Sequence, residues 1–409
     1  MTIPETLKRQ RWPLVFFLLV SVMLALCFAV IGADGLYVDE HNHYRQIRVL
    51  SNMPLDPFLA MLPGYHLLMA GLLNLFGNHS VFFARGLTAG LGMLSIGVFF
   101  LCARTLASDP HKTVLLAAQY AFFPILFPFF FLIYTDVPSL LLVLLMVWAT
   151  LRRDYRFAGL LGCLSLLFRQ NNVIWMLFCL LLILSQSHGF NVRRYRLKAL
   201  LEDVWVFALG LALLAVFVAQ NNGFSLGGKQ WHPRGLHFGN IYMLLFYAFF
   251  LFLPMHIAHL KTTWNFIKPR LKFVLPLLMA GFAFYFLTFK NSHHFNQAAY
   301  DYAIRNKILL WAATNDLHKT LFFLPVAASV LLFCGIPLRQ KIFYWLYPLT
   351  ALVLLPAALI EQRYYLMPMV LFMLLRKDLS PAVSYATLAI YVVLSIGLLY
   401  GIHTRHFFM

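Results

Sequence analysis

Acidic side chains are scarce in this sequence of 409 residues, which contains 14 Asp and Glu against 32 Lys and Arg. Charged residues make up 11% of the chain and hydrophobic residues 62%, whereas a typical globular domain has about 25% charged residues. The shortage of charge excludes a soluble globular domain. Together with a mean hydropathy of +0.77, it predicts a protein with many membrane-spanning helices.

Several short motifs are also missing, and each absence argues against one class of site or enzyme. All five cysteines lie within or at the edge of apolar runs, so neither a disulfide framework nor a zinc site is indicated. The sequence has no glycine-rich nucleotide motif and no pair of acidic residues separated by one residue, the pattern that holds a metal-bound nucleotide sugar. A nucleotide-sugar enzyme is therefore disfavoured.

The apolar runs predict an all-α, polytopic membrane protein, because one spanning helix needs about 20 apolar residues. We expect about 11 to 13 such helices in a single domain over residues 1–409. The first run is too long for the apolar core of a signal peptide, so we interpret it as a retained helix. The runs cover residues 13–32, 82–103, 113–133, 137–151, 157–168, 173–186, 203–219, 241–258, 273–289, 320–335, 345–360, 364–375 and 382–401.

The distribution of basic residues predicts the orientation of these helices. Twenty of the 32 Lys and Arg fall in segments on the same side as the N-terminus, which places that side in the cytoplasm. The net charge of +18 is then a topology signal and an affinity for anionic lipid, and it does not require a nucleic-acid partner. The longest polar loops, residues 33–62, 220–240 and 290–319, face the periplasm or the lumen.

The first outer loop, YVDEHNHYRQIRVL, crowds Asp39, Glu40 and His43 beside Arg45 and Arg48. A carboxylate near basic partners stays ionised and can take a proton from an attacking hydroxyl, so Asp39 and Glu40 are candidate catalytic residues. Two alternatives stay open. One is an interfacial loop with solvated charge, and the other is a metal site made by Asp39, Glu40 and His43, whose spacing matches no specific metal motif.

The next segment, LDPFLAMLPGYHLLMAGLLNLFG, predicts a half-length apolar helix opened by Pro63 and Gly64. A helix of this length beside an outer loop lies in the interface or dips into the membrane. It could form one wall of a lipid-facing groove. The alternative is an ordinary helix extended by residues 74–80.

Two further outer turns carry polar residues at the ends of spans, namely YTDVPS with Asp136 and FRQNN with Arg169, Gln170 and Asn171. A charge at the edge of a membrane is costly, so it is functional or paired. These residues are candidate substrate ligands. In the structural alternative, Asp136 and Arg169 pair with each other across neighbouring helices.

The loop at residues 220–240 combines glycines with four basic side chains, Lys229, His232, Arg234 and His237. Such a loop suits a phosphate or pyrophosphate, for which Lys and Arg are the usual ligands. A solvated basic loop explains the same residues equally well. The last outer turn, LIEQRYYLMP, adds Glu361 and Arg363, which we expect to form a local ion pair.

The segments YVDEHNHY, LDPFLAMLPGYHLL, YTDVPS, LLFRQNNVIW, GKQWHPRGLHF and LIEQRYYLMP occur in a characteristic order and rough spacing. By the order and spacing of these segments, the chain resembles the α-1,2-glucosyltransferases that add the terminal glucose to the lipid-linked oligosaccharide of N-glycosylation. The resemblance extends from about residue 35 to residue 370. Gly228 stands where eukaryotic members usually carry an acidic residue. The stretch HHFNQAAYDYAIRNK is an eroded match to a later Asp-Asn-Arg-His run. The short loops suit a compact bacterial relative.

The resemblance implies a GT-C type fold and an inverting transfer of a hexose, here glucose in α-1,2 linkage, from a polyprenyl-phosphate donor to a lipid-linked or other glycan. Asp39 would be the base, with Glu40 as the second candidate. The donor phosphate would be neutralised by Arg169, Lys229, His232, Arg234 or Arg363, and no metal or other cofactor is expected. The remaining candidate substrate ligands are His43, Asp136, Gln170, Asn171, His237 and Glu361.

The resemblance also implies a multi-pass protein of the bacterial inner membrane, or of the endoplasmic reticulum in a eukaryote, with its active site on the outer side.

A transporter or flippase of lipid-linked saccharides is the alternative function, since a groove with cationic phosphate ligands serves either activity. Transporters tend to carry charges near the bilayer midplane, whereas here the polar clusters gather at one face. This asymmetry favours the enzyme.

Overall fold

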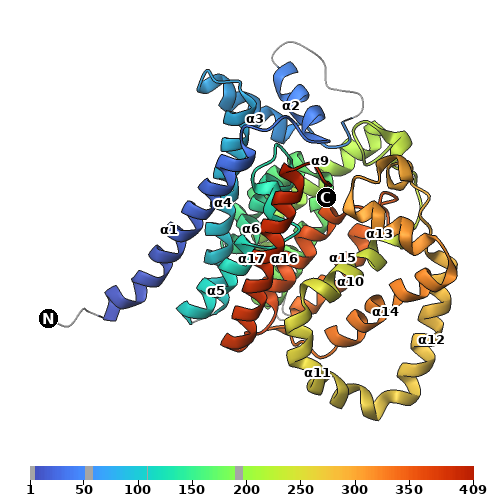
Figure 1. Cartoon of the computed structure of the whole chain (residues 1–409). Helices are drawn as coiled ribbons and strands as arrows, with labels where there is room; N and C mark the ends of the chain where they lie inside the picture. The colour runs from blue at the N-terminus through green and yellow to red at the C-terminus, as the bar shows by residue number, and fades with distance from the viewer. Residues whose placement is uncertain (1–4, 51–58, 108, 189–196) are drawn as a thin grey trace. The chain divides into compact units, whose positions relative to one another are not determined.

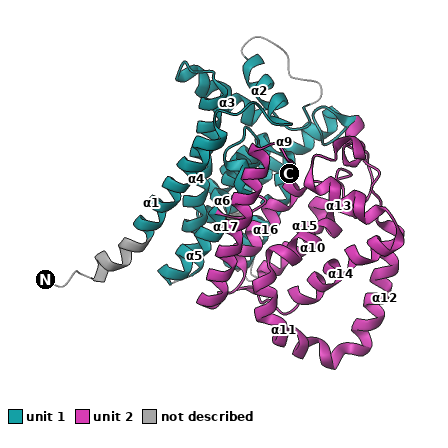
Figure 2. Cartoon of the chain, in the orientation of Figure 1, with its two compact units in different colours: residues 1–121, 126–229 teal, residues 122–125, 230–409 magenta. Residues whose placement is uncertain are grey.

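The predicted all-α class is confirmed by the computed structural model, which describes residues 5–50, 59–107, 109–188 and 197–409 (Figure 1). Within these ranges, β-type backbone pairing is limited to two isolated bridges, Ala303–Phe408 and Leu338–Arg376. The helices form two compact units. We call residues 1–121 and 126–229 the first unit, and residues 122–125 and 230–409 the second unit (Figure 2). That they act as one domain stays a prediction.

The polytopic architecture is also confirmed. Among the described residues, six helices are long and apolar enough to cross a membrane: Pro13–Ile31, Val81–Leu106, Glu202–Asn221, Leu253–Thr288, Asp316–Phe333 and Pro381–His403. Five shorter apolar helices accompany them, at Asp136–Leu151, Tyr155–Phe168, Gln170–Gln186, Gly239–Leu251 and Lys341–Leu354. The chain is therefore an integral membrane protein.

In the first unit, α4 packs against α1, α5 and α6 (Figure 1), and α7 contacts both α6 and α9. Short 3-10 turns interrupt the unit at η1 (Phe127–Phe130) and η2 (Gln170–Asn172). The helices are α1 (Glu5–Ile31), α2 (Glu40–Val49), α3 (Gly64–Leu75), α4 (Val81–Leu106), α5 (Pro110–Ala121), α6 (Asp136–Leu151), α7 (Tyr155–Phe168), α8 (Val173–His188) and α9 (Leu197–Asn221).

In the second unit, α14 packs against α10, α11, α12 and α13. Apolar side chains such as Leu260, Phe273 and Leu277 are exposed on α11 and α12, as expected of helices in contact with lipid. The helices are α10 (Gly239–Leu251), α11 (Leu253–Ile267), α12 (Leu271–Thr288), α13 (Ile304–Ala313), α14 (Asp316–Phe333), α15 (Leu346–Leu354), α16 (Leu366–Leu375) and α17 (Pro381–His403).

The span predicted at residues 113–133 is wrong. Helix α5 ends at Ala121, and the chain continues through turns and η1 to Tyr134, buried at every position. Pro124 and Pro128 account for the break, because proline donates no backbone hydrogen bond and disrupts a helix interior. Irregular backbone of this kind is tolerated at membrane depth only where protein surrounds it.

The span predicted at residues 241–258 is likewise two helices. Helix α10 ends at Leu251 and α11 begins at Leu253, with Phe252 between them. Pro254 lies in the first turn of α11, where a missing backbone N–H costs nothing.

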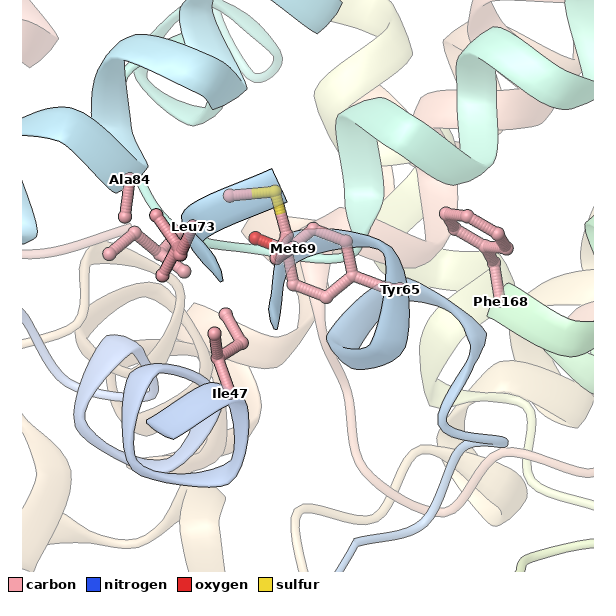
Figure 3. Close-up of a cluster of buried hydrophobic side chains, with 7 residues drawn as sticks. Ile47, Tyr65, Met69, Leu73, Ala84 and Phe168 are labelled. Atoms are coloured by element: carbon pink, nitrogen blue, oxygen red, sulfur yellow. The ribbon is translucent and has the colours of Figure 1, made fainter. Parts of the chain in front are cut away.

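The half-length helix predicted after Pro63 is confirmed as α3, for which Pro63 is the N-cap. It is a separate helix, because Gly77 adopts a positive φ of 62° and Ser80 caps the start of α4. The buried side of α3 carries Tyr65, Met69 and Leu73. These pack in one hydrophobic cluster with Ile47, Ala84, Ile133 and Phe168 (Figure 3). The cluster fixes α2 and α3 to α4 and α7.

Gly64 lets the start of α3 approach α7 closely. A Cβ atom at this position would lie 2.7 Å from the carbonyl oxygen of Leu167. We expect Gly64→Ala to lower the free energy of unfolding by about 1–3 kcal/mol, the usual cost of overpacking. Thermal unfolding of the purified protein in detergent measures this.

The control is Gly71→Ala on the same helix, where the new Cβ meets nothing within 4 Å. We expect this change to be neutral or to stabilise α3 by up to about 1 kcal/mol, since alanine favours helix over glycine. Equal unfolding temperatures for the two variants would contradict the close α3–α7 contact.

Candidate functional site

Glu40 is the fully buried member of the predicted acidic pair. Its Oε1 accepts hydrogen bonds from Arg85 Nε (3.0 Å) and the backbone N–H of Ile133 (2.8 Å). Its Oε2 accepts from Arg85 Nη2 (2.6 Å) and the backbone N–H of Tyr37 (2.9 Å). A carboxylate offers about four acceptor positions. Because all of them are occupied, the geometry favours an anchoring role for Glu40 over the predicted catalytic one.

Arg85, near the start of α4, is also fully buried. Besides Glu40 it binds the turn that follows α1. Its Nη1 donates to the carbonyls of Ile31 (2.9 Å) and Asp34 (2.8 Å), and its Nη2 donates to that of Gly35 (3.1 Å). Removing one partner of such a pair would leave an uncompensated buried charge, which costs about 3–5 kcal/mol.

Asp39 has different surroundings. It is the N-cap of α2 and is partly exposed, and its backbone N–H donates to the hydroxyl of Tyr134 (3.1 Å). The preceding residue, Val38, has φ of 40°, which is strained for a β-branched residue. Asp39 is therefore the more accessible carboxylate of the pair, and its catalytic role stays a prediction.

The turns YTDVPS and FRQNN meet in the first unit. Arg169 Nη2 lies 2.9 Å from Asp136 Oδ1, so the predicted pairing of these residues is confirmed. Thr135 Oγ1 accepts from both Nε (3.1 Å) and Nη2 (2.9 Å) of the same guanidinium. Tyr134 stands next in the chain and contacts the backbone of Asp39. The polar residues of three separate segments thus form one cluster around Tyr134.

Two other residues of FRQNN bind parts of the first unit that lie far away in the sequence. Gln170 is buried and donates through Nε2 to the carbonyls of Ala60 (3.1 Å) and Phe224 (3.2 Å). Asn172 is also buried and donates to Ser139 Oγ (2.9 Å). Asn171 is half-buried. Gln170 therefore joins loop segments, and substrate binding by Gln170 and Asn171 stays a prediction.

His43 is buried beside a second histidine that the sequence analysis did not single out. His43 Nδ1 lies 3.0 Å from His66 Nε2 of α3, and the His43 ring contacts the Tyr134 ring edge-on at 5.5 Å between centroids. Desolvation lowers the pKa of His66 to about 4. His66 is therefore neutral at physiological pH, and its contact with His43 links α2 to α3.

The basic loop divides between the two units. In the first unit, Lys229 is exposed and its Nζ donates to the carbonyl of Asn221. In the second unit, His232 and Arg234 are exposed, and the backbone N–H of His237 donates to the carbonyl of Leu355 (2.7 Å). Lys229 and Arg234 are exposed, each in its own unit, and phosphate binding by this loop stays a prediction.

The predicted ion pair of Glu361 and Arg363 is confirmed in the second unit, with 3.3 Å between Oε2 and Nη2. A closer partner, Arg305, lies at 3.0 Å from the same oxygen. Arg305 also donates to the carbonyl of Met409 (2.8 Å). Glu361 is 1% exposed. Because one of its oxygens contacts both guanidinium groups, it holds the two arginines side by side.

Buried asparagines support this turn. Asn240 Oδ1 accepts from the backbone N–H of Glu361 (3.1 Å) and from the hydroxyl of Tyr365 (2.9 Å). Asn296 exchanges hydrogen bonds with the backbone of Ile360 (2.9 Å each) and donates to Asn306 Oδ1 (3.0 Å). The stretch HHFNQAAYDYAIRNK, which resembles the family only weakly, thus supplies the residues that shape the Glu361 turn.

Among the described residues, no three or more His, Cys, Asp or Glu side chains are grouped so that they could hold a metal ion. The alternative of a metal site at Asp39, Glu40 and His43 lacks support for a further reason. The oxygens of Glu40 are bound by Arg85, and His43 Nδ1 faces His66.

Sequence analysis missed Arg85, His66 and Arg305. A usable signal existed for Arg85, which stands alone in the apolar run 82–103. A charge inside such a run is costly unless it is paired. Tyr134 opens the YTDVPS turn, but no sequence signal marks its contact with Asp39.

Comparison with known proteins matches most of this chain to one family of proteins. The DIE2/ALG10 family model matches residues 33–194 and 182–374. The chain is similar to curated proteins named Dol-P-Glc:Glc(2)Man(9)GlcNAc(2)-PP-Dol alpha-1,2-glucosyltransferase. The human protein is 23% identical over 402 residues, and the Arabidopsis thaliana protein is 25% identical over 449 residues. The alignments cover 83% of this chain, and 83% and 85% of those relatives. No solved structure matches, so the GT-C fold stays a prediction.

His66 makes stability depend on pH in a defined window. Its pKa in the folded protein, about 4, lies below the ordinary value of about 6.5, so the unfolded chain binds more protons between these values. The contribution of neutral His66 to the free energy of unfolding is then fully present above pH 6.5, and it is lost as the pH falls toward 4. We expect His66→Gln to reduce the drop in thermal unfolding temperature between pH 7 and pH 5.

The control is His41→Gln, since His41 is exposed on the neighbouring helix α2. This variant should show the same drop in unfolding temperature as the unmodified protein. If the unfolding temperature of the His66→Gln protein fell as far as that of the unmodified protein, His66 would not titrate in this window.

Proposed function

The chain belongs to the DIE2/ALG10 family, and from this membership we propose that it is an inverting glycosyltransferase that uses a polyprenyl-phosphate sugar as donor. It moves a hexose, glucose, in α-1,2 linkage to a glycan carried on a lipid. The observation that carries the proposal is the alignment with the named glucosyltransferases over 83% of the chain. The active site faces the lumen of the endoplasmic reticulum or the periplasm.

Asp39 is the general base in this mechanism. An acceptor hydroxyl gives its proton to the Asp39 carboxylate while its oxygen attacks the anomeric carbon of the donor sugar. The bond between that carbon and the phosphate oxygen breaks, and its electron pair leaves with the lipid phosphate. Attack from the face opposite the phosphate converts a β-linked donor into an α-linked product. The partial exposure of Asp39 beside the fully bonded Glu40 supports this assignment.

Arg169 and Lys229 of the first unit bind the donor phosphate. Arg169 is 15% exposed and is held by Asp136 through one of its terminal nitrogens. A guanidinium fixed in this way presents its remaining donors without a further loss of side-chain freedom. Neutralising the phosphate improves it as a leaving group, so the proposed transfer requires no metal ion.

The second unit has a charged cluster of its own. Arg305 and Arg363 flank the buried Glu361, and guanidinium groups held in this way can donate hydrogen bonds to sugar hydroxyls.

Gly228 of the first unit, at the position where the family usually has an acidic residue, adopts a φ of 59°, which glycine tolerates best. We infer that the acceptor differs from that of the eukaryotic relatives at this point.

Asp39→Asn tests the base. The change keeps the size of the side chain and removes its basicity, so we expect transfer to fall about 10²- to 10⁴-fold with an unchanged unfolding temperature. The assay compares polyprenyl-phosphate glucose with a nucleotide-glucose donor, using purified protein in lipid and a lipid-linked glycan acceptor. Transfer should occur from the lipid donor alone.

Asp301→Asn is the control, because Asp301 is exposed in the second unit. It should leave transfer unchanged. Retained activity in Asp39→Asn would exclude Asp39 as the base. If the unmodified protein transferred sugar from neither donor, a transporter of lipid-linked saccharides would become the better hypothesis, and uptake of the lipid-linked sugar into vesicles would be measured next.

Arg169→Lys and Lys229→Gln test the phosphate site. Each change weakens a charge-assisted hydrogen bond, so the KM for the lipid donor should rise about tenfold while the KM for the acceptor stays the same. Arg156→Gln, at an exposed residue of α7, serves as the control. Unchanged donor KM in both variants would remove these residues from the donor site.

A further inference from the structure

Arg85 occupies a position that neither the sequence motifs nor the proposed mechanism explains. It is fully buried, and its guanidinium binds Glu40 and four backbone carbonyls, that of Ile31 at the end of α1 and three in the turn that follows. We propose that Arg85 is a positioning residue for the transfer reaction: through Glu40 it fixes the place and direction of the Asp39 carboxylate. This inference rests on the proposed function of Asp39 as the base.

The first step of the argument concerns the turn itself. Helix α1 ends at Ile31, and the C-terminal carbonyls of a helix have no partner within it. Arg85 Nη1 binds the carbonyl of Ile31, and the cation lies where the helix dipole attracts positive charge. Arg85 Nη1 and Nη2 also hold the carbonyls of Asp34 and Gly35, so the turn is shaped around one guanidinium.

The second step concerns Glu40. Its two oxygens receive Arg85 through both Nε and Nη2, a two-point contact that fixes orientation as well as distance. The same oxygens receive the backbone N–H groups of Tyr37 and Ile133. The ion pair therefore joins the turn, α4 and the segment that leads to Tyr134.

The third step concerns Asp39. It precedes Glu40 directly, and its own backbone N–H is held by the hydroxyl of Tyr134, one residue after Ile133. The positive φ of Val38 is a conformation that persists only where the surroundings impose it. Residues on both sides of Asp39 are thus anchored by the Arg85–Glu40 pair. A base must stay within hydrogen-bond reach of its proton, so loosening this anchor slows the chemical step.

Arg85→Lys tests the proposal. Lysine keeps the positive charge but lacks the planar fork that binds Glu40 at two points and the carbonyls of the turn. We expect kcat to fall about 10²-fold while the KM for the lipid donor is unchanged. In an Asp39→Asn background, Arg85→Lys should cause no further loss, because a positioning residue acts through the group that it positions.

Hydrogen exchange of residues 33–49 gives a readout that does not depend on activity. Arg85→Lys should increase exchange in this segment, whereas the control Arg104→Lys, at an exposed residue of the same helix, should change neither exchange nor kcat. If the unmodified protein is inactive but exchange rises in Arg85→Lys, the proposed function fails and the anchoring of the turn stands.

A second variant covers the case in which Arg85→Lys does not fold. Glu40→Gln with Arg85→Met removes both charges, so no unpaired charge stays buried. This double variant should fold and show the same loss of kcat and the same faster exchange. Multiplicative losses of kcat in the Asp39→Asn background would overturn the proposal. A raised KM for the lipid donor with normal hydrogen exchange in Arg85→Lys would also overturn it. The same holds for a wild-type kcat in either variant if residues 33–49 exchange faster.

Discussion

A carboxylate buried in a largely apolar protein must be paired with a cation, because its desolvation is otherwise too costly. Three buried carboxylates obey this constraint. Glu40 pairs with Arg85, Asp136 with Arg169, and Glu361 with Arg305 and Arg363. Each pair lies next to backbone that is not helical. The pairs therefore decide the shape of the segments that hold the candidate site residues.

Side-chain amides solve the same problem for neutral groups. Non-helical backbone leaves carbonyl and N–H groups without regular partners, and buried groups of this kind need hydrogen bonds. Gln170 supplies them in the first unit, and Asn240 and Asn296 supply them in the second. The polar residues in this mostly hydrophobic chain thus pair buried charges in some places and bind buried backbone groups in others.

The sequence predicted the parts of the structure that depend on local patterns. The apolar runs predicted most of the helices, and Pro63 with Gly64 predicted α3. Polar islands at the ends of spans predicted the Asp136–Arg169 pair. The failures came from long-range contacts. The run at 113–133 was judged by hydrophobicity, although its two prolines argued against one helix. Glu40 and Asp39 were indistinguishable by composition, because their difference depends on Arg85 and Ile133, which lie far along the chain.

The distance along the chain between Glu40 and its partners has a consequence for biogenesis. Arg85 follows Glu40 by 45 residues, and Ile133 follows it by 93. Chains fold during synthesis from the N-terminus, so α1 enters the membrane before either partner exists. The acidic turn stays hydrated until α4 is inserted, and it acquires its final shape only when the segment up to Ile133 has been added. The turn is therefore among the first parts of the first unit to be synthesised, but its contacts are complete only after Ile133 has been added.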